Sequence, residues 1–242
     1  MDSHIIPETF WKSIYDDQHH ALPLSMDQFE NRFISKGLRE KLLCVDCESK
    51  LSKWETTLKR DLVDIGEQKS NYLKITSPAR GITLVQGIRY ADFKLAVLSI
   101  LWRMSIASIP FFSEYGLGKY EEVLRNAIYN ERALPEKAFP ILIARYELNG
   151  VFNPGFIMGF PPGKRDSLFT IQQFMIWGHL FSVVIAYGRF PAVPIEIFLR
   201  ESGQIFVQTR NVLELASPTS ALSRIFDPRV KAFFEKGKKT QT

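Results

Sequence analysis

Two cysteines and a histidine near the N-terminus carry the clearest chemistry in this sequence. Cys44 and Cys47 are separated by two residues, a spacing that lets both sulfurs bind one metal ion at about 2.3 Å each. A structural zinc ion takes four ligands, so this pair supplies half of a site. The remaining candidate ligands are His4, His19, His20 and Glu48 or an aspartate. The sequence therefore predicts a zinc-binding segment.

Thiol chemistry is the alternative for the cysteine pair. No thioredoxin-like strand is predicted before Cys44, and the basic residues nearest to the pair are Lys41 and Lys50. These features favour metal binding over redox chemistry. Without zinc, we expect two reduced thiols that cap a helix.

The second candidate function of His4 is that of a general base. A histidine in that role needs a neutral imidazole beside a hard divalent cation such as Mg²⁺ or Mn²⁺. The competing interpretation makes His4 a structural residue or a zinc ligand. Nearby residues that could bind the divalent cation are Glu8, Asp16, Asp17, His19 and His20.

Two segments around these residues resemble a known family. Ser3-His4-Ile5-Ile6-Pro7 and the later Leu43-Cys44-Val45-Asp46-Cys47-Glu48 are similar to the His-Ile-Ile-Pro…Leu-Cys-x-x-Cys core of HNH-like, treble-clef endonucleases. In that family an upstream Cys-x-x-Cys completes a zinc site, and the histidine activates water beside a catalytic metal. The resemblance therefore implies that His4 is the catalytic base and that Cys44 and Cys47 bind structural zinc.

The sequence departs from the family pattern at several positions. It starts three residues before His4, so the upstream cysteine pair has no counterpart. Ser3 stands where the family has Asp or a second His, and Glu48 follows Cys47 without the usual Asn. We expect either a degenerate module or a longer reading frame that supplies the missing cysteines.

The similarity extends to a second part of the chain. The segments 87–94 (GIRYADFK) and 98–105 (LSILWRMS) are similar to bacterial proteins of unassigned function that carry this finger at their N-termini. This similarity implies a bacterial context and no mechanism.

Helices are expected around the candidate site. A short helix is predicted over Pro7–Tyr15, and apolar residues three and four apart predict an amphipathic helix over Ser49–Ile65, directly after the cysteine pair. Tyr90–Ser108 is apolar on nearly all sides and should be buried, so its Arg103 needs a carboxylate or carbonyl partner. Further helices are predicted over Lys119–Ile128 and Ser217–Glu235.

Strand-like runs dominate the C-terminal half. Ser167–Gly188 has no Asp, Glu, Lys or Arg and approaches the length of a membrane span, but its β-branched and aromatic content predicts two buried strands. In that segment His179 is expected to be a hydrogen-bonded core or edge residue. The predicted strands are Tyr72–Thr76, Ile82–Val85, Phe139–Leu148, Phe156–Phe160, Leu168–Trp177, Phe181–Tyr187, Ile195–Leu199 and Ile205–Val207.

These elements predict an α+β fold. We expect a small zinc-finger-like module at residues 1–66, then an α+β domain at residues 67–242 with a central buried helix and a mostly antiparallel sheet. Hydrophobic residues make up 45% of the 242 residues, which predicts a folded chain.

Charge and composition bound the function. A net charge of +5 permits a DNA partner, but the basic residues are scattered. No signal peptide, membrane span or phosphate-binding loop is predicted, and a reducing cytoplasm fits the two cysteines. Two functions stay open: an HNH-like, metal-dependent nuclease acting on DNA or its degenerate relative, and a non-catalytic module with a structural zinc clip that binds a protein partner.

Overall fold

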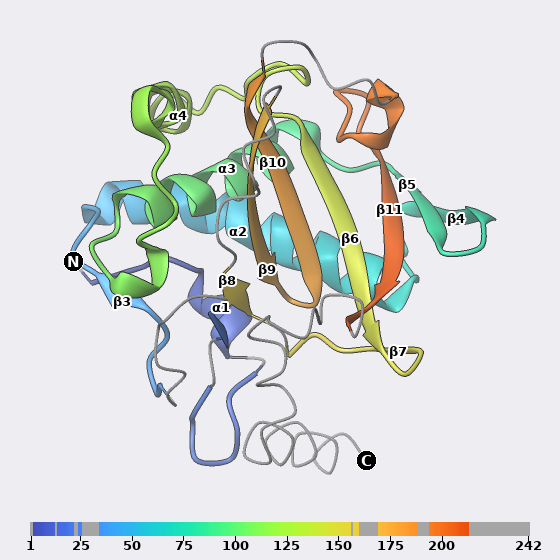
Figure 1. Ribbon diagram of the computed structural model, residues 1–242, viewed down its shortest axis with the longest axis horizontal. Coiled ribbons are helices and arrows are strands. Elements are labelled where there is room, and N and C mark those ends of the chain that lie inside the picture. The colour runs from blue at the N-terminus through green and yellow to red at the C-terminus, as the bar shows by residue number, and fades with distance from the viewer. Residues whose placement is uncertain are drawn as a thin grey trace.

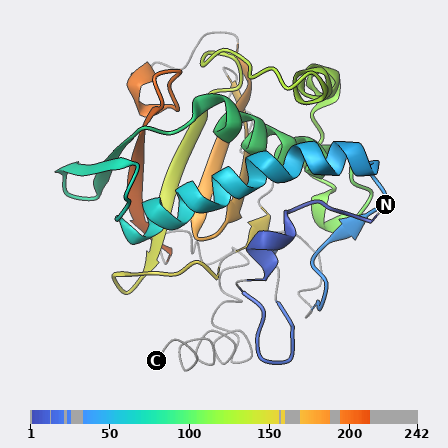
Figure 2. The ribbon, with the colours of Figure 1, turned by 180° about the vertical axis from the view of Figure 1, so that it is seen from behind.

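A long helix and a buried helix lie across one face of a sheet (Figures 1 and 2). The computed structural model describes residues 2–12, 14–21, 24–25, 34–155, 157–159, 169–187 and 194–212. Helix α2 spans Val45–Glu67 and α3 spans Tyr90–Ile106, and the two helices pack against each other. This arrangement is α+β, as predicted.

The main sheet is mixed and mostly antiparallel. Its strand order is β2-β8-β9-β10-β6-β11-β5-β4, with β7 paired to β6. The pairs β11–β6 and β2–β8 are parallel, and the others are antiparallel. The strands are β2 Leu24–Ser25, β4 Lys74–Ala79, β5 Ile82–Gln86, β6 Ile141–Leu148, β7 Val151–Phe152, β8 Met158–Gly159, β9 Phe169–Ile176, β10 His179–Tyr187 and β11 Gln204–Asn211.

The uncharged segment of the sequence forms a β-hairpin. Strands β9 and β10 pair through a two-residue turn in which Trp177 and Gly178 both have positive φ, the backbone that tight hairpins require. The prediction of two buried strands is confirmed. Within the described residues, no helix has the length and apolar character needed to cross a bilayer.

Helix α2 begins earlier than the periodicity predicts. Its first residue is Val45, not Ser49, and Cys44 is its N-cap, with the Cys44 sulfur accepting a hydrogen bond from the Cys47 N–H. Val45 and Asp46 are exposed, so this first turn adds nothing to an apolar pattern. The helix therefore starts inside the cysteine pair.

Helix α3 is the centre of the hydrophobic core. Its residues from Phe93 to Met104 are buried, including Lys94 and Arg103, which confirms the predicted buried helix. The predicted boundary at residue 66 lies at the C-terminal end of α2. Apolar residues from both sides of it, such as Leu58 and Val97, join one hydrophobic cluster.

The remaining elements match the predictions unevenly. The strand predicted at Ile195–Leu199 is wrong: Ile195–Ile197 is a 3-10 turn after Pro194, which starts the turn with a fixed φ. The helix predicted at Ser217–Glu235 lies outside the described residues. The other helical elements are α1 Glu8–Trp11, η1 Pro110–Phe112, η2 Gly118–Tyr120 and α4 Glu121–Tyr129.

Candidate functional site

A short strand pair positions His4. Strand β1 (Ser3–His4) pairs with β3 (Arg39–Glu40) in an antiparallel register that places His4 directly opposite Arg39. The Ile5 N–H donates to the Leu38 carbonyl at 3.1 Å and extends the pairing. The chain then enters α2, so two strands and a helix surround His4.

The buried guanidinium of Arg103 fixes the backbone of His4. It donates to the His4 carbonyl at 2.8 Å and to the Glu55 carboxylate at 2.6 Å, while only 1% of its side chain is exposed. The predicted carboxylate or carbonyl partner of Arg103 is therefore confirmed, and both kinds are present. Through this one side chain, α3 connects β1 to α2.

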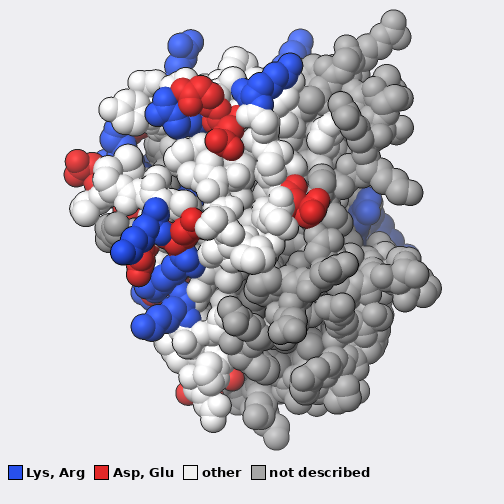
Figure 3. Space-filling view, turned by 60° about the vertical axis from the view of Figure 1, so that its left-hand side comes forward, with Lys and Arg blue, Asp and Glu red and all other residues white. Residues whose placement is uncertain are grey.

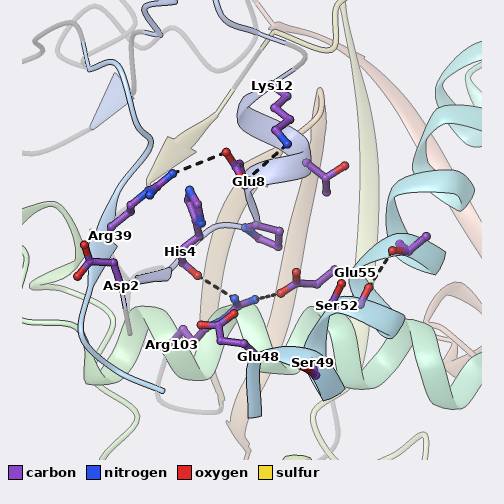
Figure 4. A pocket seen from close by; sticks show the side chains of 13 residues that line it. Asp2, His4, Glu8, Lys12, Arg39, Glu48, Ser49, Ser52, Glu55 and Arg103 are labelled. Atoms are coloured by element: carbon purple, nitrogen blue, oxygen red, sulfur yellow. Dashed lines mark hydrogen bonds and ion pairs between the residues drawn. The ribbon is translucent and has the colours of Figure 1, made fainter. Parts of the chain in front are cut away.

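His4 lines a pocket of about 710 Å³. In Figure 4, Glu8 and Arg39 lie on one side of the His4 ring, and Arg103 and Glu48 lie on the other. Glu48, Ser52 and Glu55 reach the pocket from α2, where spacings of four and three residues place them on one helix face. The other lining residues are Asp2, Pro7, Thr9, Lys12, Ser49 and Thr56.

Two polar atoms in this pocket are buried and have no hydrogen-bond partner among the described residues. They are Nε2 of His4 and Oε1 of Glu48. Buried polar atoms in native proteins are nearly always paired, because an unpaired one costs about 1–3 kcal/mol. These two atoms could therefore bind a cation, a water molecule or a polar ligand.

Burial also sets the protonation state of His4. Desolvation, aided by the positive charge of Arg39, lowers the pKa of His4 below its usual value, although Glu8 and Glu48 oppose the shift. The imidazole is therefore neutral at pH 7 and has one nitrogen that can accept a proton.

The rim of the pocket carries two cations that share one carboxylate. An Arg39 nitrogen lies 3.6 Å from a Glu8 oxygen, and the Lys12 ammonium lies 3.8 Å from the other oxygen. Both distances exceed a good hydrogen bond, so these ion pairs are loose. An incoming phosphate could compete with Glu8 for both cations.

The cysteine pair lies on a different side of α2. Cys47 lines a separate hollow together with Leu43, Leu51 and Trp102, and it is absent from the pocket of His4. The Cys47 backbone N–H and thiol donate to the Cys44 sulfur and lower the pKa of Cys44. The same interaction, with burial, raises the pKa of Cys47.

The predicted zinc ligands do not come together. Both cysteines and all four histidines of the sequence lie in the described residues, which contain no group of three or more His, Cys, Asp or Glu that could hold a metal ion. His19 stacks on Tyr15 in an exposed turn, beside His20. The described residues therefore do not fit a four-ligand zinc ion, and the predicted zinc-finger module is not shown.

His179 has the structural role that the sequence predicts. It is fully buried at the start of β10, and its Nδ1 lies 2.7 Å from the Trp177 carbonyl. It lines neither the pocket of His4 nor the hollow of Cys47.

Sequence reasoning missed Arg39, Lys12 and Arg103 as neighbours of His4. Arg39 is brought there by the register of two-residue strands, and Arg103 comes from a helix 99 residues further along the chain. The only local signal was Lys12, one helical turn after Glu8.

Charges on the molecular surface are intermixed. On the described part of the face in Figure 3, Lys and Arg side chains lie next to Asp and Glu side chains. The described part of this face therefore shows no extended basic patch of the kind that binds nucleic acid without sequence preference.

Comparisons with known proteins give no relative. No protein-family model matches the sequence, and neither the curated proteins nor the solved structures contain a match.

Proposed function

We propose that this chain is an HNH-like hydrolase that cleaves phosphodiester bonds in DNA with the help of a divalent metal ion. His4 is the general base of this reaction. The proposal rests on one observation: the unpartnered nitrogen of His4 and the unpartnered oxygen of Glu48 are buried in the same pocket. The choice of reaction comes from the resemblance of the sequence around His4 to HNH-like endonucleases.

The base would act through its neutral imidazole. An attacking water would donate a proton to the unpartnered nitrogen of His4 while its oxygen bonds to phosphorus. The bond from phosphorus to the leaving sugar oxygen would break, and that oxygen would take a proton from solvent. The lowered pKa of His4 keeps its nitrogen unprotonated near pH 7. Arg103 donates a 2.8 Å hydrogen bond to the His4 carbonyl and also pairs with Glu55. This buried ion pair therefore fixes the backbone that carries the His4 ring. Such positioning is what general-base catalysis needs.

The pocket fits a divalent cation bound by few protein atoms. Mg²⁺ is usually bound through one or two carboxylates and keeps several water molecules, so the lack of a three-residue cluster among the described residues does not conflict with it. Glu48, with its unpartnered oxygen, would hold the ion. When bound, the ion would neutralise charge on the phosphate.

Arg39 and Lys12 would bind the scissile phosphate. Both line the pocket, and both are engaged only loosely by Glu8. The planar guanidinium of Arg39 matches two phosphate oxygens at once. An activity on DNA fits the cytoplasmic location that we expect for this chain.

The test is a plasmid-nicking assay with Mg²⁺ or Mn²⁺. We expect His4→Ala to lower the nicking rate by about 100-fold or more, the usual range for general acid–base catalysis. Glu48→Gln should also lower the rate, because it removes the carboxylate that would hold the metal ion. Matched controls are His19→Asn, in an exposed turn, and Glu67→Gln, at the exposed end of α2. The rate of the unmodified chain should fall only below pH 6.5, because the pKa of His4 is lowered.

Absence of metal-dependent nicking by the unmodified chain would refute this proposal. Equal losses in the control variants would also count against it, because they would indicate a general effect on folding. The predicted role as a non-catalytic module that binds a protein partner would then take precedence.

A further inference from the structure

Cys44 and Cys47 are arranged as a vicinal dithiol at the start of a long helix. The Cys44 sulfur lies 3.5 Å from the Cys47 backbone nitrogen and accepts a hydrogen bond from its N–H. Helix α2 has 23 residues, so its N-terminal dipole and free N–H groups favour a thiolate at Cys44. Residues one helical turn apart lie within the range that a disulfide can bridge.

The two sulfurs differ in access. Cys44 is exposed, whereas Cys47 is partly buried in the hollow beside α3 and α4. The Cys44 sulfur can therefore react with a disulfide in solution. The Cys47 sulfur is less accessible and reacts only after a partner is linked to Cys44. This asymmetry is what thiol–disulfide exchange requires of an attacking and a resolving cysteine.

The hollow next to Cys47 is mostly apolar. Leu43, Leu51, Trp102 and Ile128 form its walls, with a volume of about 230 Å³. One molecule occupies about 30 Å³ in liquid water, so the hollow is larger than several water molecules and accepts an aliphatic side chain. Lys50 also lines the hollow.

We propose that Cys44 and Cys47 form a redox-active dithiol that exchanges with a disulfide in a polypeptide. An apolar residue beside the polypeptide's cysteine occupies the hollow at Leu43, Leu51 and Trp102. The dithiol is separate from the pocket of His4, so this function goes beyond the proposed hydrolase. It also accounts for a Cys-x-x-Cys without further zinc ligands in the described residues.

The exchange proceeds in two balanced steps. The Cys44 thiolate attacks one sulfur of the ligand disulfide, forms a mixed disulfide and releases the other ligand sulfur as a thiolate. The Cys47 thiol loses its proton to solvent, attacks the Cys44 sulfur and releases the second ligand thiolate. The ligand disulfide is reduced to two thiols, and the dithiol of the chain is oxidised to a Cys44–Cys47 disulfide.

The first test follows the reaction of the reduced, full chain with glutathione disulfide by mass spectrometry and alkylation of free thiols. The unmodified chain should end as an intramolecular disulfide, without bound glutathione. Cys47→Ser should accumulate one glutathione on Cys44. Cys44→Ser should react roughly tenfold more slowly, because its remaining sulfur is the less exposed one.

These variants should keep the fold. Serine is a preferred N-cap residue, so Cys44→Ser preserves the start of α2. Unchanged helix content and unfolding midpoints will confirm this. Equal reaction rates of the two single variants, or a stable double glutathione adduct of the unmodified chain, would overturn the proposal.

A zinc measurement adds an independent outcome. Elemental analysis of the purified chain should find no zinc that depends on the cysteines. About one zinc per chain, lost in a Cys44→Ser/Cys47→Ser double variant, would overturn the dithiol proposal in favour of metal binding.

The second test addresses the hollow. A disulfide-linked peptide with leucine beside its cysteine should react faster than glutathione disulfide. Leu43→Ala, which removes one wall, should remove this advantage and leave the rate with glutathione disulfide unchanged. Val45→Ala is the matched control, since Val45 is 62% exposed and does not line the hollow. Equal rates for both disulfides would contradict the proposed ligand class.

The outcome is distinguishable from that of the hydrolase proposal. Thiol exchange is measured without DNA or metal, and His4→Ala should leave its rate unchanged. Nicking is measured on the reduced chain, where Cys44→Ser should leave its rate unchanged.

Discussion

Removal of the Arg103 guanidinium should destabilise the protein severely. Its side chain is 1% exposed, and that of its partner Glu55 is 14% exposed. Arg103→Met keeps most of the apolar stem but leaves the Glu55 carboxylate and the His4 carbonyl without their donor. Breaking a buried ion pair in this way costs about 3–5 kcal/mol. For a chain of this size, that loss lowers Tm by roughly 6–20 °C.

A double-mutant cycle separates the ion pair from the loss of packing. Glu55→Leu combined with Arg103→Met removes both charges, so the double variant should recover most of the stability lost in the single variants. Urea unfolding at pH 7 gives the free energies, and an unchanged slope with urea concentration shows that the same surface is exposed on unfolding. Arg125→Met is the control, because Arg125 pairs with Glu122 on the exposed surface and should leave the midpoint unchanged.

The role assigned to this buried pair can be refuted by two outcomes. It is wrong if Arg103→Met costs less than about 1 kcal/mol, the value of an exposed pair. It is also wrong if the double variant loses the sum of both single losses, because the two side chains would then act independently.

Three further predictions concern the core. Burial lowers the pKa of His179 to about 3, so its imidazole is neutral in the folded state and titrates near 6.5 when unfolded. The free energy of unfolding therefore has its full value with respect to His179 above pH 6.5, and it falls as the pH drops toward 3. Compared with His179→Gln in urea unfolding, the unmodified chain should lose about 2 kcal/mol more between pH 7 and pH 5. Lys94→Met removes the donor to the Pro135 and Ala138 carbonyls, both at 2.7 Å, and should cost about 2 kcal/mol or more, with faster amide exchange around residues 134–138. Gly203→Ala places a Cβ 2.3 Å from the Ile88 carbonyl oxygen at positive φ and should cost about 3 kcal/mol, whereas Gly118→Ala, with open space around it, should cost only about 1–2 kcal/mol in thermal unfolding.

Local patterns predicted the elements that bury a regular stripe or face. Helix α2 follows from the spacing of its apolar residues, and α3 follows from the near absence of charge. The strands β9 and β10 follow from their β-branched and aromatic content. The same content misled at Ile195, because Pro194 starts a turn there regardless of the residues that follow.

The surroundings of His4 could not be predicted in the same way. Strands of two residues contain no alternation, so the sequence does not show that Arg39 lies opposite His4. The burial of Arg103 predicted that it needs a partner, but the choice of Glu55 depends on how α2 packs on α3. Both facts are set by contacts between distant parts of the chain.

Helical geometry explains why the motif divides into two sites. Cys47 and Glu48 are neighbours on α2, and successive residues of an α-helix are rotated by about 100°. Glu48 therefore joins Ser52 and Glu55 on the face toward His4, while Cys47 joins Leu51 on the face toward Trp102.

A metal ion held by Glu48 would consequently lie in a different hollow from the one that Cys47 lines. In the sequence His4 and Cys47 belong to one pattern, but in the fold they line two separate hollows. Chemistry at the sulfurs and chemistry at the imidazole should therefore respond to different substitutions. This independence is why the exchange and nicking assays, applied to the same variants, test two functions and not one.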